Sequence, residues 1–200
     1  MDYKRIERLV FDKLVEKFEN KKFPVSVSPR IIGDAMQEWV SDILDDFYEG
    51  DRTKFTPSKL LSRRAFEDCI ILDGNEYHSI DIKTHCKSST RSAPNLVSIK
   101  RLYKFIRGHP FNHFDILIVD YGLSGDHIHV DDVKFMPIEQ ISWESLNIVN
   151  IGSGQLQLKD ANCIIRKNDP DWDKKFMINV EKFYKNQYGS IGKNMKYFGL

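Results

Sequence analysis

The sequence predicts an α/β fold with a mixed central β-sheet flanked by helices. Two observations support this. Apolar residues recur at helical spacing in the first quarter of the chain, and residues 114–121 form a nearly continuous apolar run. Such a run is typical of a strand that is buried on both faces. A chain of 200 residues can bury a sizeable core, and we expect one domain over residues 1–200.

The first elements are helices. Apolar residues at helical spacing predict one helix over 3–19 and a second over 31–48, with residues up to about 30 as the connection. Residues 51–65 are expected to form a loop that contains a turn of helix near 58–61.

A β-hairpin follows. Residues 66–72 form a short apolar strand, Asp73-Gly74 has turn chemistry, and residues 76–83 form the returning strand. The rest of the chain predicts, in order, a helix opened by Pro94 over 94–107, strands over 114–121 and 127–136, a helical turn over 137–141, strands around 147–151 and 155–159, and a helix from Pro170 to about 187.

The hairpin carries the residues with the clearest chemistry. Asp81 and Lys83 are two residues apart, so both point to one face while Ile80 and Ile82 point into the core. The hairpin can bring Asp68 alongside them. Two carboxylates suit a hard cation such as Mg²⁺, and an adjacent Lys can orient a water or steady phosphate charge. The alternative is an ordinary exposed ion pair.

A cationic stretch lies directly downstream. The chain is nearly neutral, at +1 with 30 basic and 29 acidic residues, yet no Asp or Glu occurs between Ile82 and Phe114. The basic residues in this stretch are Lys83, Lys87, Arg91, Lys100, Arg101, Lys104 and Arg107, and the short polar residues include Ser88, Ser89, Thr90, Ser92 and Asn95. Such a stretch attracts a phosphate backbone. A solvated loop and a charged helix face are the alternative.

The turn at Gly152-Ser153-Gly154 allows close backbone approach to a groove. Asn150, Ser153 and Gln155 could then offer hydrogen bonds to base edges. An ordinary hairpin turn explains the same residues.

Histidines and cysteines give weaker signals. His109 and His113 have the i, i+4 spacing of a zinc site, but Pro110 argues against a helix between them, so a surface loop is favoured. His127 and His129 are expected to be exposed strand residues. The three cysteines lack a Cys-x-x-Cys pair, so we expect neither a disulfide framework nor a structural zinc site.

Several segments together resemble the type II restriction endonucleases of the PD-(D/E)xK superfamily, in particular its HincII/EcoRV-like members. They are Ile80-Asp81-Ile82-Lys83-Thr84, Arg91 to Ser98, the helix segment from Gly33 to Glu38, Asn150 to Gln157, and residues 170–187. The resemblance covers most of residues 30–187. The chain departs from the family signature at Glu67, where a Pro is usual.

The resemblance implies a restriction-endonuclease-like fold and assigns roles. Asp68 and Asp81 would bind Mg²⁺ with the Ile82 carbonyl oxygen as a third ligand, and Lys83 would position or help deprotonate the attacking water. Glu38 is a candidate accessory ligand, although a solvated helix face is equally consistent. The residues expected to contact DNA are Thr84, Lys87, Arg91, Ser92, Asn95, Lys100, Arg101, Lys104, Asn150, Ser153 and Gln155.

The implied activity is Mg²⁺-dependent cleavage of both strands of a short, palindromic site in double-stranded DNA, leaving 5′-phosphate ends. Symmetric cleavage is most simply performed by a homodimer. Residues 188–200 are expected to be mobile or to cross the DNA. Lacking an apolar run of 18 residues or a signal-peptide pattern, the chain is expected to stay in the cytoplasm, away from membranes.

Two rival functions stay open. One is a repair or structure-specific nuclease on the same fold. The other is a DNA-binding module without catalysis, in which Asp81 and Lys83 form a surface ion pair.

Overall fold

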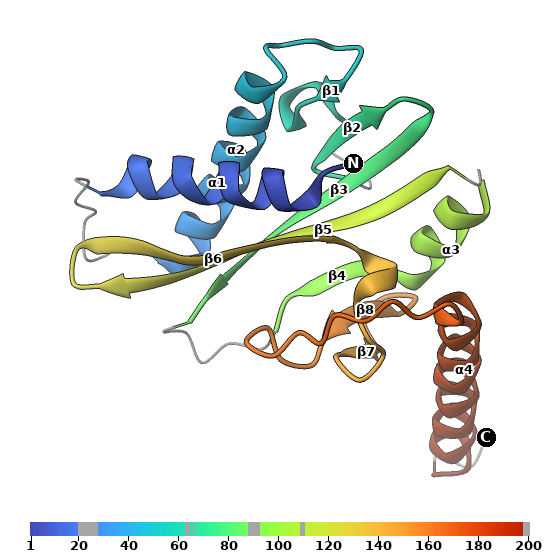
Figure 1. The fold of residues 1–200 in the computed structure, drawn as a ribbon. Coiled ribbons are helices and arrows are strands. Elements are labelled where there is room, and N and C mark those ends of the chain that lie inside the picture. Colours follow the sequence, from blue (N-terminus) through green and yellow to red (C-terminus); the bar gives the residue numbers. More distant parts are fainter. Residues whose placement is uncertain (20–27, 63–64, 66, 88–92, 109–110, 198–200) are drawn as a thin grey trace.

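The computed structural model describes residues 1–19, 28–62, 65, 67–87, 93–108 and 111–197, and side chains as far as residue 189 (Figure 1). The elements are α1 Tyr3–Phe18, α2 Pro29–Phe47, β1 Phe55–Thr56, η1 Ser58–Leu60, β2 Cys69–Asp73, β3 Glu76–Cys86, β4 Asn95–Ser98, α3 Ile99–Gly108, β5 Asn112–Ser124, β6 His127–Pro137, η2 Ile138–Gln140, β7 Leu146–Val149, β8 Gln155–Leu158 and α4 Trp172–Tyr197. Among the described residues, no helix is both long enough and apolar enough to span a membrane.

The central sheet has the strand order β1-β2-β3-β5-β6. Strands β3 and β5 pair in parallel, whereas the other neighbours are antiparallel. The predicted mixed sheet flanked by helices is therefore confirmed. The predicted hairpin is also present, with Asp73 paired to Glu76 and Gly74 at φ +61° in the turn.

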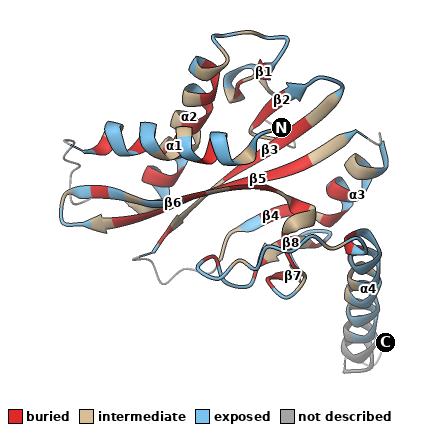
Figure 2. Cartoon of the chain, in the orientation of Figure 1, coloured by how far each residue is buried: buried red, intermediate tan, exposed pale blue. Residues whose placement is uncertain are grey.

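A second sheet, which the sequence patterns did not reveal, has the antiparallel order β4-β8-β7. It lies with α3 on one side of the central sheet, while α1 and α2 cover the other side (Figure 1). Each side has its own apolar core (Figure 2). Strand β5 serves both cores, because Leu117 and Val119 face α1 and α2 while Ile116 and Ile118 face the second sheet. The prediction of a strand buried on both faces is confirmed.

Several predicted boundaries are wrong. The hairpin strands expected over 66–72 and 76–83 span Cys69–Asp73 and Glu76–Cys86, and two further differences are larger. Residues 95–98, expected in a helix over 94–107, form β4, and the helix starts only at Ile99. The apolar residues Leu96 and Val97 fit either structure, and pairing with β8 decides for a strand. The last helix does not stop near 187, because α4 continues through Tyr197, so most of the expected tail is helical.

Helix α2 lies unusually close to β3. Ser28 caps its first turn by accepting a hydrogen bond from the Ile31 amide at 3.4 Å, and Pro29 occupies the first helical position. One turn later, a Cβ added at Gly33 would lie 2.5 Å from Oγ1 of Thr84 on β3. Glycine at position 33 therefore sets the distance between helix and strand.

Gly33→Ala should destabilise the protein. Overpacking costs about 1–3 kcal/mol, of which up to about 1 kcal/mol is offset by the better helix propensity of Ala. Chemical denaturation measures the difference. In a Thr84→Ala background, which removes the contacted oxygen, the penalty should largely disappear.

Gly189 is the matched control. It also lies in a helix, α4, but a Cβ there meets nothing within 4 Å. Gly189→Ala should therefore leave stability unchanged or raise it. A Gly33→Ala variant as stable as this control would contradict the proposed close contact.

Candidate active site

The candidate site forms where β3 extends beyond the first residue of β2 while it stays paired with β5 on its other side. The Asp68 amide donates to the Ile80 carbonyl at 2.8 Å, just before β2 begins. Beyond this point the Ile82 peptide has no β2 partner. Its N–H donates to Oδ2 of Asp68 at 2.7 Å, and its carbonyl accepts from Nε2 of Gln37 on α2, also at 2.7 Å. Asp68, just before β2, and Gln37 of α2 thus both contact Ile82 of β3.

Asp81 and Lys83 lie on either side of that peptide, on the same face of β3. Lys83 Nζ contacts Asp81 Oδ1 at 2.7 Å. Ile80 and Ile82 are fully buried on the other face, as the alternation predicts. Oδ2 of Asp81 is buried and has no hydrogen-bond partner among the described residues.

The electrostatics of this pair are costly. Burial raises the pKa of Asp81 to about 7, and the nearby Asp68 carboxylate adds to the rise while Lys83 opposes it. Burial alone would lower the pKa of Lys83, but the carboxylates of Asp81 and Asp68 outweigh this and hold it above its ordinary value. A half-satisfied buried carboxylate beside a second one is unfavourable unless a further cation compensates it.

The residues present fit Mg²⁺. The donor set consists of two carboxylates and, at the Ile82 peptide, a backbone carbonyl, which are the oxygen ligands that hard cations prefer. The unpartnered Oδ2 of Asp81 offers a buried acceptor with nothing to accept. The Ile82 carbonyl is engaged by Gln37, so this third contact would require the Gln37 amide to share or release it.

Glu38 lies on the α2 side of the same edge. A hollow of about 600 Å³ is lined by Asp34, Gln37, Glu38, Asp42, Ser58, Lys59 and Asp68. The structure therefore brings exposed Glu38 to the same hollow as Asp68, whereas Asp81 and Lys83 do not line it. Asp68 connects this hollow with Asp81 and Lys83, because its carboxylate accepts a hydrogen bond from the amide of Ile82, which lies between them.

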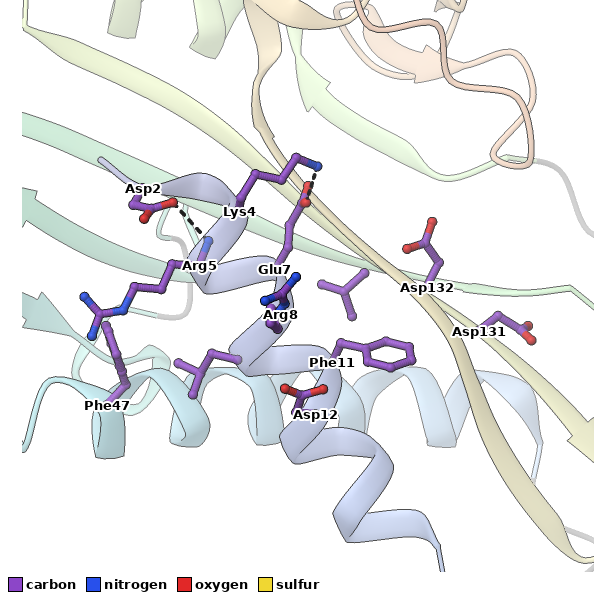
Figure 3. Close-up of a pocket in the computed structure, with 12 residues that line it drawn as sticks. Asp2, Lys4, Arg5, Glu7, Arg8, Phe11, Asp12, Phe47, Asp131 and Asp132 are labelled. Atoms are coloured by element: carbon purple, nitrogen blue, oxygen red, sulfur yellow. Dashed lines mark hydrogen bonds and ion pairs between the residues drawn. The ribbon is translucent and has the colours of Figure 1, made fainter.

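A larger hollow, of about 980 Å³, lies elsewhere, between α1, the end of α2 and β6 (Figure 3). Several of its charged groups are already satisfied locally. Lys4 pairs with Glu7 at 2.5 Å, and Asp2 caps α1 by accepting from the Arg5 amide at 3.0 Å. Chemistry, rather than size, therefore identifies the site at Asp68, Asp81 and Lys83.

Two segments expected to contact DNA are neighbours in the second sheet. Asn95 of β4 lies opposite Gln157 of β8, and Ser98 lies opposite Gln155. The turn before β8 carries exposed Asn150 and Ser153. Segments that are more than 50 residues apart in the sequence thus form one structural unit.

The other expected DNA contacts are spread more widely. Lys100, Arg101 and Lys104 are exposed on α3, which follows β4 directly. Lys87 is exposed and pairs with Asp131 at 3.5 Å. Thr84 instead packs under Gly33 of α2. Arg91 and Ser92 lie outside the described residues.

Sequence reasoning missed two neighbours of the site. Gln37 was passed over in favour of Glu38, yet it is Gln37 that contacts the Ile82 peptide. His85 continues the alternation of Asp81 and Lys83, which puts it on the same face. Its Nδ1 lies 3.0 Å from Oδ1 of the buried Asp120, which also pairs with Lys134. The two-residue spacing was the signal that could have found His85.

Comparisons with known proteins agree with this architecture. A solved structure of the NlaIV restriction endonuclease matches with a TM-score of 0.50 and 16% sequence identity, over 89% of this chain and 89% of that one. The chain has a restriction-endonuclease-like fold. Neither a family model nor a curated protein matches its sequence. The likeness therefore establishes the fold, and the chemistry must be argued from the site.

A second buried carboxyl has a similarly raised pKa but different surroundings. Burial raises the pKa of Glu139 in η2 to about 7, and the Asp115 carboxylate adds to the rise. Its Oε2 is buried without a hydrogen-bond partner in the described part of the chain. Unlike Asp81, Glu139 has no Lys or Arg among the groups that shift it.

Glu139 should make stability depend on pH. The folded protein keeps its proton up to about pH 7, whereas the unfolded chain releases it near the ordinary value of 4.5. Folding therefore binds a proton in this window, and stability should fall as the pH rises through it, by on the order of 3 kcal/mol. Glu139→Gln should flatten the dependence and raise Tm at pH 8. An equally steep pH dependence in this variant would show that other groups cause it.

Proposed function

We propose that this protein is a type II restriction endonuclease of the PD-(D/E)xK kind, HincII/EcoRV-like, that cleaves double-stranded DNA with Mg²⁺. One observation carries the proposal: Asp68, Asp81 and Lys83 gather at the open edge of β3, on a restriction-endonuclease-like fold. An exposed ion pair does not explain the site, because Asp81 is only 6% exposed and one of its oxygens has no partner among the described residues.

Each residue has a distinct role. Asp68 and Asp81, with the Ile82 carbonyl, would hold Mg²⁺, and Glu38 would hold a water or act as an accessory ligand from the α2 side. When bound, Mg²⁺ polarises the scissile phosphate and lowers the pKa of a coordinated water. Lys83 keeps its proton in the metal-free protein, and its ammonium orients the attacking water and stabilises the charge that develops on phosphorus oxygens.

The product follows from the line of attack. Water entering opposite the 3′ oxygen expels it, so the new bond gives a 5′-phosphate and the leaving group becomes a 3′-hydroxyl. Cleavage of both strands of a palindrome is most simply done by two such sites related by a twofold axis, which a homodimer would supply.

DNA would bind across the second sheet and α3. Asn95, Asn150, Ser153 and Gln155 offer hydrogen-bond groups on adjoining elements and would read base edges. The exposed basic residues of α3, together with Lys87, Arg91 and Ser92, would contact the backbone, whereas Thr84 packs against α2.

Replacing the central residues should separate cleavage from binding. Asp81→Ala and Lys83→Ala should each lower the cleavage rate by several orders of magnitude, because the charge that stabilises the transition state is removed. Binding of the same DNA, measured in Ca²⁺ to prevent cleavage, should survive. Glu16→Gln, at an exposed ion pair on α1, is the control and should cut normally. Either site variant cutting at the wild-type rate would refute the assigned roles.

The same preparation distinguishes the rival functions. A plasmid digest with Mg²⁺ should give discrete fragments whose ends map to one short sequence. A smear, or cutting confined to branched or damaged DNA, would favour a repair or structure-specific nuclease. Intact DNA in the presence of tight binding would favour a non-catalytic DNA-binding module.

The basic residues of α3 should act by binding phosphates. Arg101→Ala and Lys104→Ala should weaken binding to all DNA sequences alike and reduce the slope of log K against log[salt] by about one unit for each phosphate that is no longer neutralised. Lys13→Ala on α1, also an exposed Lys, should leave the slope unchanged. An unaltered slope in both α3 variants would place α3 away from the DNA.

A further inference from the structure

A group of metal-ligating side chains lies at the other end of β3. Glu76 and His78 belong to β3, and His113 lies directly opposite His78 on the parallel strand β5. One ligand atom from each of these three residues lies within 4.8 Å of the others. The rings of His78 and His113 stack with centroids 4.7 Å apart. The group is separate from the candidate active site and does not depend on the proposed function.

A hydrogen bond to Asp115 fixes the orientation of the His78 ring. Its Nδ1 lies 2.7 Å from Oδ2 of Asp115, which is fully buried, and the other Asp115 oxygen accepts a hydrogen bond from the Tyr3 hydroxyl at 3.0 Å. A carboxylate behind one ring nitrogen is the arrangement that orients metal-binding histidines. Nδ1 is thereby occupied, and Nε2 is the nitrogen that points toward Glu76.

At the front of the group, two imidazole nitrogens face one carboxylate. His78 Nε2 lies 3.3 Å from Oε2 of Glu76, and His113 Nε2 lies 3.9 Å from its Oε1. With Nδ1 of a neutral His78 donating to Asp115, Nε2 carries a lone pair that faces the carboxylate, so acceptor opposes acceptor. His78 is 2% exposed, so water screens this interaction poorly. A proton or a metal ion between these groups would relieve this opposition.

We propose that Glu76, His78 and His113 bind Zn²⁺ through Nε2 of both histidines and the Glu76 carboxylate. Ligands about 2.0–2.2 Å from a tetrahedral Zn²⁺ lie roughly 3.3–3.6 Å from one another. The observed 3.3 and 3.9 Å lie near this spacing, and the stacked rings would have to turn for both Nε2 lone pairs to point at one ion. His113 is 32% exposed, which leaves a path for the ion and room for a water as the fourth ligand.

The ligand types separate this site from the one at Asp81. Two imidazoles select Zn²⁺ and similar transition metals, whereas carboxylates with a carbonyl suit Mg²⁺. The sites are also apart, since His78 and Asp81 are three residues apart on an extended strand, roughly 10 Å, and point to opposite faces. The bound ion would join the start of β3 to the start of β5.

Metal binding can be measured without DNA. The full chain should carry no histidine tag, because a tag adds imidazoles and alters the Met1 amino group that pairs with Asp73 at 2.8 Å. After EDTA treatment and dialysis, one equivalent of Co²⁺ should give the visible absorption bands of tetrahedral cobalt, and Zn²⁺ should abolish them. Calorimetry should show one Zn²⁺ per chain. In an Asp81→Asn background, which removes the proposed Mg²⁺ site, Zn²⁺ should raise Tm while an equal concentration of Mg²⁺ does not. No stoichiometric Zn²⁺ binding would mean that a proton fills the gap, and would overturn the proposal.

Variants locate the ion. His113→Ala and Glu76→Gln should each weaken Zn²⁺ binding by about tenfold or more and remove the cobalt bands, since each removes a ligand. His129→Ala is the matched control, because His129 on β6 is 53% exposed and, like His113, lies near a carboxylate, here that of Asp131. Asp81→Asn should also leave Zn²⁺ binding intact. Full affinity in His113→Ala, or loss of binding in Asp81→Asn, would overturn the proposed site.

Discussion

The structure depends on the way β3 extends beyond β2, the strand that pairs with it. Pairing with β2 ends near Ile80, so the Ile82 peptide would be left without hydrogen bonds in a largely buried place. Asp68 satisfies its N–H and Gln37 satisfies its carbonyl. Because both groups need a partner, the Asp68 carboxylate, just before β2, and helix α2 both lie against Ile82. Close packing at Gly33 keeps α2 near enough for this.

The side chains of β3 alternate between its two faces, and the two faces have different roles. Ile80 and Ile82 anchor the strand in the core beneath α1 and α2, and this burial holds Asp81 and Lys83 on the opposite side. The pair gains little as a structural element, because desolvation offsets the attraction between buried charges. Groups kept at a cost in stability, in an arrangement that a cation would complete, are typical of sites maintained for chemistry.

The sequence alone predicted those features that depend on residues close together in the chain. The turn at Asp73-Gly74, the two-residue spacing of Asp81 and Lys83, and the apolar run of β5 each report on neighbours in the chain, and the mixed sheet followed from them. Residues 95–98 were misassigned because their strand partner, β8, comes more than 50 residues later. Gln37 escaped notice for a similar reason. Nothing near it in the sequence indicates the Ile82 carbonyl.

Parallel pairing of β3 with β5 explains why histidine spacing in the sequence was misleading. His113 was weighed with His109, four residues away, but the register places it beside His78, where both rings lie close to the Glu76 carboxylate. Parallel strands bring together residues that belong to distant segments, here joined through β4 and α3. One strand pair thus carries Asp81 and Lys83 on one face, and Glu76, His78 and His113 on the other. Because hard and borderline cations prefer different donors, two ions could be held on β3 without competing for the same groups.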